Sequence, residues 1–182
     1  MRVIAGELRG RRLAAPPGSG TRPTSDRVRE ATFNALVSMG EVEGAVVLDA
    51  FAGSGALGIE ALSRGAERCT FVERDREALQ VLRANLETCR LGPDRATVVA
   101  GDAHLSTGSF DLVLLDPPYR FDGWNALLGG LDAEVAVCES GAPLPPTDGW
   151  SVVREKAYGA TVVTILRRIS DLDATVTEED QG

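Results

Sequence analysis

Short apolar runs alternate with amphipathic segments from residue 45 onward, and this alternation constrains the fold more than any other feature of the sequence. Strands that alternate with helices form a doubly wound, mostly parallel sheet. The stretch between Asp111 and Asp116 is fully apolar, as a strand covered on both faces requires. The predicted strands are residues 45–49, 68–73, 96–100, 111–115 and 134–139, followed by an antiparallel hairpin of 150–155 and 160–168. The fold class is therefore α/β and Rossmann-like, with helices on both faces of the sheet.

Three helices are predicted between or before these strands. The first begins near Thr24, with Thr24, Ser25 or Asp26 as its N-cap, and Gly40 ends it. The second runs from a glycine-rich turn to about Arg64. The third covers residues 75–91.

The two ends of the chain differ in composition from its centre. Residues 3–6 and 12–15 flank a turn-rich stretch and are expected to form a short β-hairpin. Residues 170–182 are acidic and lack an apolar pattern, so we expect a disordered tail. The predicted organisation is a basic arm over 1–22, one catalytic domain over 23–169 and the tail over 170–182.

Charge is distributed unevenly along the chain. The net charge is −8, yet residues 1–29 carry seven arginines against two acids, a net of +5, which leaves −13 for the rest. A basic arm on an acidic body favours contact with phosphate groups, although a solvated surface in an arginine-rich protein is the alternative. The candidate RNA contacts are Arg9, Arg11, Arg12, Arg22 and Arg27.

Composition excludes several classes of function. No stretch approaches the roughly 20 apolar residues of a membrane span, and the N-terminus lacks the apolar run of a signal peptide, so we expect a cytoplasmic protein. Cys69, Cys89 and Cys138 form no CxxC pair, and His104 is the only histidine. We therefore expect no metal site and no Ser-His-Asp triad.

A glycine-rich turn after the first strand predicts a nucleotide-like cofactor. Gly53, Gly55 and Gly58 satisfy the pattern G-x-G-x-x-G, and Glu73 follows Gly53 by twenty residues, where a ribose-binding acid belongs. These features suit NAD and S-adenosylmethionine equally well.

Acidic residues at the strand ends separate the two cofactors. Asp49 ends the first strand, where a carboxylate would repel a pyrophosphate but complement an ammonium and a sulfonium. Asp102 follows the third strand and could accept from the adenine amine, while the Ala103 amide contacts a ring nitrogen. The predicted contacts to S-adenosylmethionine are Asp49, Ala50, Gly53, Gly55, Glu73, Asp102 and Ala103.

The fourth strand ends in the sequence Asp116-Pro117-Pro118-Tyr119, which predicts the catalytic site. Two prolines stiffen the turn and remove two amide donors, so acceptors face the site. The Asp116 carboxylate and the Pro117 carbonyl can each accept one N–H of a planar exocyclic amine, and Tyr119 can stack on the base. The predicted catalytic residues are Asp116, Pro117 and Tyr119, and the predicted reaction is in-line methyl transfer to nitrogen.

At this point the chain resembles the small bacterial 16S rRNA guanine-N2 methyltransferases, over almost its whole length. The likeness is carried by Arg2-Val3-Ile4-Ala5-Gly6, Arg9-Gly10-Arg11-Arg12-Leu13, Arg22-Pro23-Thr24-Ser25-Asp26-Arg27-Val28-Arg29-Glu30 with Phe33-Asn34, the turn 49–58, Asp116-Pro117-Pro118-Tyr119 and Tyr158-Gly159. The Arg-Pro-Thr segment is its most family-specific part. One departure is Ala160, where an acidic residue is expected in relatives, and another is the acidic tail.

The resemblance implies a seven-stranded class I methyltransferase sheet with S-adenosylmethionine as cofactor. It implies a guanine N2 amine of 16S rRNA as substrate, within the assembled small ribosomal subunit. The alternatives are an amino methyltransferase of DNA adenine N6 or protein glutamine N5, an NAD-dependent oxidoreductase, and a catalytically silent RNA-binding domain. The missing target-recognition domain disfavours the DNA enzyme, and the oxidoreductase leaves the Asp-Pro-Pro-Tyr sequence without a role.

Overall fold

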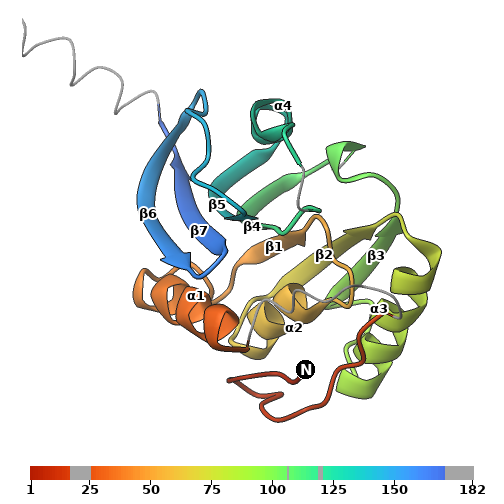
Figure 1. Cartoon of the computed structure of the whole chain (residues 1–182). Coiled ribbons are helices and arrows are strands. Elements are labelled where there is room, and N and C mark those ends of the chain that lie inside the picture. Colours follow the sequence, from red (N-terminus) through yellow and green to blue (C-terminus); the bar gives the residue numbers. More distant parts are fainter. Residues whose placement is uncertain (17–25, 106, 119–120, 171–182) are drawn as a thin grey trace, which may run out of the picture.

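Seven strands form one sheet in the computed structural model, which describes residues 1–16, 26–105, 107–118 and 121–170 (Figure 1). Their order across the sheet is β3-β2-β1-β4-β5-β7-β6. β1 to β5 run parallel, whereas β7 lies antiparallel between β5 and β6. The strands are β1 (Val46–Asp49), β2 (Arg68–Glu73), β3 (Ala96–Ala100), β4 (Ser109–Leu115), β5 (Asp132–Ser140), β6 (Trp150–Tyr158) and β7 (Thr161–Arg168). The predicted Rossmann-like, mostly parallel sheet of seven strands is confirmed.

Alternate residues of each strand point to opposite faces, and the two faces carry separate cores. Val47 and Leu114 belong to the core beneath α1, α2 and α3. Leu48 and Leu115 belong to the core that contains Trp124 of α4. Figure 1 shows α1, α2 and α3 on one side of the sheet and α4 on the other, so helices cover both faces as predicted. The helices are α1 (Asp26–Ser38), α2 (Ala56–Ser63), α3 (Arg76–Cys89) and α4 (Trp124–Gly129), with a 3-10 turn η1 (Ala103–Leu105).

Local signals explain where the helices begin and end. The Asp75 side chain caps α3 by accepting a 2.9 Å hydrogen bond from the Ala78 amide. α4 and η1 were not predicted, because elements of six and three residues are too short to show a periodic apolar pattern. None of the helices in the described part of the chain has both the length and the apolar composition needed to span a bilayer.

The N-terminal segment (residues 1–16) lies against α2 and α3 (Figure 1). The predicted hairpin is present in a short form, with an antiparallel bridge between Arg2 and Arg12. Across it the Val3 amide donates to the Arg11 carbonyl at 2.9 Å and the Leu13 amide donates to the Met1 carbonyl at 3.1 Å. Beyond this pairing, the amides of Ile4 and Ala5 donate to the Glu60 carboxylate at 2.8 and 3.1 Å. The segment is thus held by a helix side chain.

Two further contacts tie the N-terminal segment to the domain. The side chains of Val3 and Leu13 are buried in the core beneath α1, α2 and α3. The Asn85 carboxamide on α3 exchanges hydrogen bonds of 2.9 and 3.0 Å with the main chain of Ala14 and donates at 2.8 Å to the Ser54 carbonyl. The first sixteen residues therefore share the core of the sheet. The predicted domain boundary at residue 22 lies outside the described residues, and so does the predicted tail over 170–182, apart from Ser170.

Glu60 is the centre of a buried charge cluster. Its carboxylate is fully buried and accepts a 2.7 Å hydrogen bond from Arg64 Nε, with Arg29 Nε at 3.7 Å. Arg29 is itself 1 % exposed and also pairs with Asp26 at 3.0 Å. One of the seven arginines that make the N-terminal region basic is therefore internal, and the surface of this region is less positive than its sequence indicates.

We expect Glu60→Gln to lower the free energy of unfolding by about 3–5 kcal/mol, because it leaves Arg29 buried without a full counter-charge. Glu67→Gln is the matched control, since Glu67 and its partner Arg68 are both exposed, and it should change stability by less than about 1 kcal/mol. Urea unfolding of both variants measures the difference. Equal stabilities would contradict the role given to Glu60.

Candidate active site

Three of the predicted site residues lie at the carboxyl ends of adjacent parallel strands. Asp49 ends β1, Glu73 ends β2, and Asp116 directly follows β4. Val47, Phe71 and Leu114 belong to the core under α1, α2 and α3. Each of the three acids lies two residues after one of these apolar side chains. Because strand side chains alternate, the three carboxylates lie on this same side of the sheet. The parallel register brings together residues that are far apart in sequence.

Asp49 is the most deeply buried of the three. Its side chain is 1 % exposed, and Oδ2 accepts a 2.9 Å hydrogen bond from the Gly58 amide in the first turn of α2. Burial raises the pKa of Asp49 from its ordinary value of 3.8 to about 7. The Gly58 hydrogen bond lowers this pKa, whereas the charges of Asp116 and Glu73 raise it further. The charges that act on Asp49 are thus both negative, and a cation beside it would be stabilised.

Glu73 organises the turn between β1 and α2. One carboxylate oxygen accepts a 2.8 Å hydrogen bond from the Gly53 amide. The other accepts at 2.8 Å from the amides of Arg74 and Asp75. Glu73 therefore connects the ends of β1 and β2, and it lies beside the glycine-rich turn as the spacing of twenty residues predicts.

Glycine is required at the three positions of the turn for different physical reasons. A Cβ on Gly58 would lie 2.3 Å from the Phe71 ring, and a Cβ on Gly55 would lie 2.4 Å from Leu82. Both glycines are therefore required by packing inside the domain. Gly53 has a φ of +53°, and a Cβ there would meet only the Phe51 carbonyl at 4.0 Å. Gly53 is the glycine that borders open space, so the predicted cofactor contact is better supported at Gly53 than at Gly55.

The remaining predicted cofactor residues follow β1 and β3. Asp102 follows β3, accepts a 3.0 Å hydrogen bond from the His104 amide and pairs with Arg74 at 3.5 Å. The Ala103 side chain is buried at the start of η1. The Ala50 amide donates to the Leu114 carbonyl at 3.1 Å, and the Ala50 side chain packs in the core under α4. Ala50 therefore continues the sheet and packs inside the domain.

These groups fit S-adenosylmethionine better than NAD. Asp49, Glu73 and Asp116 place negative charge where a pyrophosphate would be repelled and where a sulfonium and an ammonium would be stabilised. The open face of Gly53 leaves room for a ligand beside the main chain. Within the described ranges, no group of three or more His, Cys, Asp or Glu side chains is arranged to hold a metal ion.

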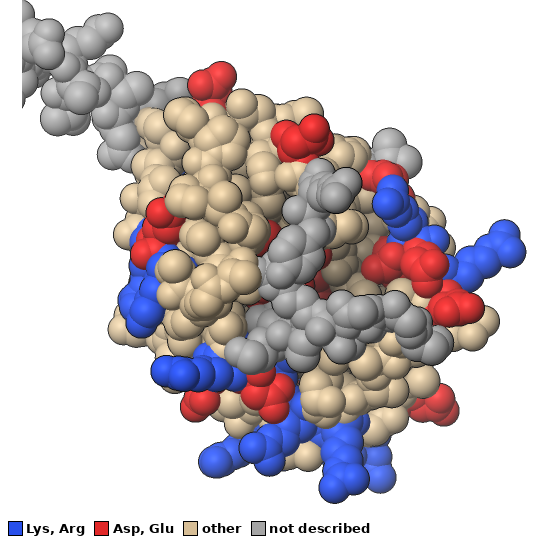
Figure 2. Space-filling model, viewed as in Figure 1, with Lys and Arg blue, Asp and Glu red and all other residues tan. Residues whose placement is uncertain are grey.

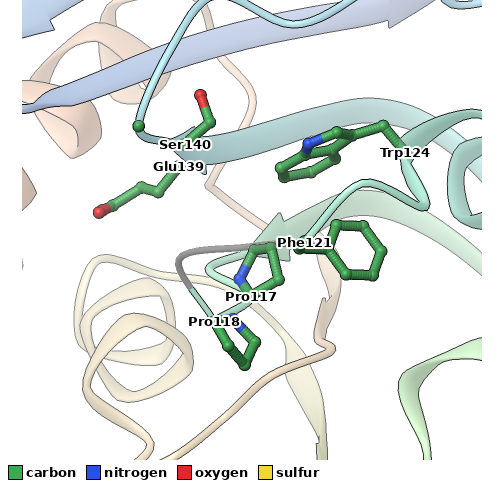
Figure 3. A pocket seen from close by; sticks show the side chains of 7 residues that line it. Pro117, Pro118, Phe121, Trp124, Glu139 and Ser140 are labelled. Carbon is green, nitrogen blue, oxygen red and sulfur yellow. The ribbon is translucent and has the colours of Figure 1, made fainter.

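A small, open pocket lies beside the predicted catalytic turn. Pro117 and Pro118 form one side, and Figure 3 shows Phe121 and Trp124 on another, with Glu139 at the end of β5. The Phe121 ring meets Trp124 edge-on, with ring centres 5.1 Å apart. Asp116 is partly exposed beside this pocket, whereas Tyr119 lies outside the described residues.

The sequence interpretation missed four residues that line the pocket. Phe121 and Trp124 belong to the stretch before and within α4, and Glu139 and Ser140 end β5. Ligands in open α/β sheets bind beyond the carboxyl ends of the strands. Had this rule been applied to the fifth strand as it was to the first four, Glu139 and Ser140 would have been found.

The predicted RNA contacts lie on the N-terminal segment and α1. Arg9, Arg11, Arg12 and Arg27 are exposed, and Arg22 lies outside the described residues. Figure 2 shows basic side chains gathered along the lower edge of the molecule, where Figure 1 places the N-terminal segment. The Met1 sulfur lies 3.5 Å from the Ser54 hydroxyl. The segment therefore reaches from this basic surface to the glycine-rich turn.

The sequence pattern that defines the family described as conserved hypothetical protein 95 matches residues 1–167. The chain belongs to the conserved hypothetical protein 95 family. Among similar proteins, ribosomal RNA small subunit methyltransferase D of Escherichia coli strain K12 is 38 % identical, over 92 % of this chain and 90 % of its own. The match covers the N-terminal segment and the sheet together, so the family is defined by the whole domain.

Two solved structures have the same fold as this chain. The structure of yhhF from Escherichia coli is 40 % identical, covers 92 % of this chain and 97 % of its own, and superposes with a TM-score of 0.80. Magnesium protoporphyrin IX methyltransferase from Synechocystis PCC 6803 with bound SAM covers 79 % of both chains with a TM-score of 0.65. At 17 % identity the second likeness concerns the fold alone. The sheet is that of a class I methyltransferase.

We expect Asp49→Asn to stabilise the domain at pH 8 and to have little effect at pH 4. The carboxyl has a higher pKa in the folded protein than in the unfolded chain, so its burial penalty is absent below about pH 4. The penalty grows as the pH rises to about 7 and is complete above it, at roughly 4 kcal/mol at most.

Denaturant unfolding at a series of pH values between 4 and 8 measures this effect. The control is Asp94→Asn, because Asp94 is exposed and its difference from the unmodified protein should not change with pH. A constant difference for Asp49→Asn across the series would show that burial does not disfavour the Asp49 charge.

Proposed function

We propose that this protein transfers a methyl group from S-adenosylmethionine to the exocyclic N2 amine of a guanine in small-subunit ribosomal RNA. Membership of the family and 38 % identity to an rRNA small subunit methyltransferase support the enzyme class and the type of substrate. The deciding physical observation is the placement of the Asp49, Glu73 and Asp116 carboxylates at the ends of adjacent strands on one side of the sheet, which creates a negative field there. This field favours a cationic cofactor and an amine substrate over a pyrophosphate cofactor.

The catalytic role falls to the acceptors that follow β4. The Asp116 carboxylate and the Pro117 carbonyl each accept one N–H of the guanine amine, which fixes the amine nitrogen in position. Proline at positions 117 and 118 restricts the backbone, so the two acceptors keep their orientation without a substrate. Tyr119 is the next residue in the sequence and is assigned to stacking on the base.

S-adenosylmethionine, when bound, supplies an electrophilic methyl group on a positively charged sulfur. Asp49, Glu73, Asp102 and the main chain at Gly53 and Ala103 are the residues that would hold it. Methyl transfer forms a bond from the amine nitrogen to carbon and breaks the bond from sulfur to carbon. The nitrogen then carries a positive charge and releases one proton, for which Asp116 is the adjacent acceptor. Alignment and charge complementarity supply the rate enhancement.

The pocket beside the catalytic turn determines whether a paired or an unpaired guanine can react. The Phe121 ring, packed edge-on against the buried Trp124, offers aromatic surface to a single base, and a base paired within a helix cannot reach it. The guanine must therefore be unpaired or rotated out of its helix. We assign the assembled small ribosomal subunit as the substrate particle and the cytoplasm as the location.

We expect methyl-labelled S-adenosylmethionine to label rRNA when the protein acts on small subunits from cells that lack its gene. Mass mapping of the rRNA should find one additional methyl group on a guanine N2. Calorimetry should show binding of S-adenosylhomocysteine and not of NAD. Label only in DNA or protein would refute the substrate, and binding of NAD alone would refute the cofactor.

Asp116→Ala serves as the catalytic control in this assay. It should lower the labelling rate by about 100-fold or more, because a misplaced amine loses its alignment with the methyl group. Affinity for S-adenosylhomocysteine should change far less than the rate. Asp122→Ala alters an exposed acid a few residues further along and should retain the rate. Full activity of Asp116→Ala would refute the mechanism.

Replacing Arg9, Arg11 and Arg12 by Gln should weaken RNA binding and flatten its dependence on salt. Three lost phosphate contacts should reduce the slope of log affinity against log salt by about 2. The control is Arg68→Gln, because Arg68 is exposed at the amino end of β2, remote from the carboxyl ends of the strands. Filter binding over a range of salt concentrations gives both slopes. An unchanged slope would assign these arginines to structure alone.

A further inference from the structure

The Phe121 ring contacts aromatic side chains from three separate segments. Phe51, which follows β1, meets it edge-on with ring centres 5.7 Å apart and an interplanar angle of 67°. The ring centre of His104, in the 3-10 turn after β3, lies 6.0 Å away. Trp124, the first residue of α4, meets it edge-on at 5.1 Å. Phe121 therefore connects the segments that follow β1 and β3 with the start of α4.

The main chain holds Phe121 next to the catalytic turn. The Phe121 amide donates a 2.9 Å hydrogen bond to the Pro118 carbonyl. Phe121 also lines the same pocket as Pro117 and Pro118, as Figure 3 shows. A Cβ on Gly123 would lie 3.1 Å from the Phe121 ring, so the chain just before α4 passes close to that ring. Movement of the ring and movement of the two prolines are thus linked.

The cofactor turn and the catalytic turn lead to opposite sides of the sheet. The Ala50 amide donates to the Leu114 carbonyl at 3.1 Å, where β1 and β4 end. From here one chain continues to α2 and the other to α4, which cover opposite faces (Figure 1). The side chains of Phe51 and Phe121 both pack against the core under α4. Their edge-on contact therefore joins the two chains beyond the paired part of the strands.

The proposed reaction depends on the spacing between these two turns. The glycine-rich turn after β1 is assigned to the cofactor, whereas Asp116 and the Pro117 carbonyl are assigned to the guanine amine. In-line transfer requires the amine nitrogen to face the methyl carbon closely, and a misplacement of about 1 Å lowers such a rate by about 100-fold. A phenyl ring is a rigid side chain with two torsions, so a ring between the turns fixes their separation.

We propose that Phe121 is a positioning residue that holds the catalytic turn at the correct distance from the cofactor turn through its contact with Phe51. The inference rests on the proposed function. Phe121 acts through Pro117 and Pro118 and does not touch the methyl group that is transferred. This role is separate from the aromatic surface that Phe121 offers to the base, because Phe51 is not one of the described residues that line the pocket.

A double-mutant cycle of Phe51→Leu and Phe121→Leu tests this role. The rate of methyl transfer is measured in a single turnover, with enzyme and S-adenosylmethionine in excess over small ribosomal subunits. Each variant should lower this rate by about 10- to 100-fold, because a flexible leucine leaves the spacing of the turns undefined. The double variant should be no more than a few-fold slower than the slower single variant, since both changes remove the same contact.

Binding measurements distinguish positioning from loss of affinity or of fold. The affinities of Phe121→Leu for S-adenosylhomocysteine and for small subunits should stay within a few-fold of those of the unmodified protein. The matched control is Phe110→Leu, because Phe110 packs in the same core under α4 but lies at the amino end of β4. This control should lose stability in thermal unfolding, as the other variants do, and yet keep its transfer rate within a few-fold.

Three results would overturn the role of Phe121 and leave the proposed function intact. The first is a double variant whose rate loss is the product of the two single losses, because the rings would then act independently. The second is an unchanged transfer rate in Phe51→Leu, which decides the matter even if Phe121→Leu fails to fold. The third is weaker binding of small subunits by Phe121→Leu at an unchanged rate, which would assign the ring to the base alone. Absence of rRNA methylation by the unmodified protein would instead refute the proposed function.

Discussion

The parallel register of β1 with β2 and β4 is the constraint on which the site depends. It places three carboxylates from distant parts of the sequence at one edge of the sheet, on the side that α1, α2 and α3 cover. Burial of the Asp49 carboxylate away from water opposes folding, and the nearby negative charges of Asp116 and Glu73 add to this cost. The amide of Gly58 at the start of α2 offsets part of the cost, since the first amides of a helix have no partners within it. A cation bound at this edge would remove the remaining repulsion.

Much of the molecule could be predicted from residue patterns, because a buried parallel strand and the acid that ends it are both local in sequence. β1 to β4 and the acids Asp49, Glu73 and Asp116 follow from that rule. Glu139 was not predicted as a site residue, because the sequence shows it only as the last residue of a strand. The pairing of Leu115 with Cys138 is what places it beside Asp116. Pairing between strands is a tertiary property that a single sequence does not display.

Other differences arose where side chains override local patterns. The N-terminal hairpin forms, yet its pairing is short, and the Glu60 carboxylate on α2 accepts the amides of Ile4 and Ala5. Arg29 adds to the basic count of the sequence, yet it is buried against Asp26 and Glu60. The glycine pattern was interpreted as a cofactor-binding motif. Gly55 and Gly58 are instead required because a Cβ there would collide with Leu82 and Phe71 inside the domain. In each case the decisive neighbour is remote in sequence.

The Asn85 carboxamide has a consequence for how the two ends of the site respond to each other. One side chain on α3 bonds both to Ala14 in the N-terminal segment and to Ser54 in the glycine-rich turn. Lifting the segment away from α3 would leave that buried amide with unmet hydrogen bonds, and the turn would lose a fixed point at the same moment. Detachment of the N-terminal segment and loosening of the glycine-rich turn are therefore a single cooperative event. Any contact that holds the first sixteen residues in place also restricts the motion of the backbone around Gly53.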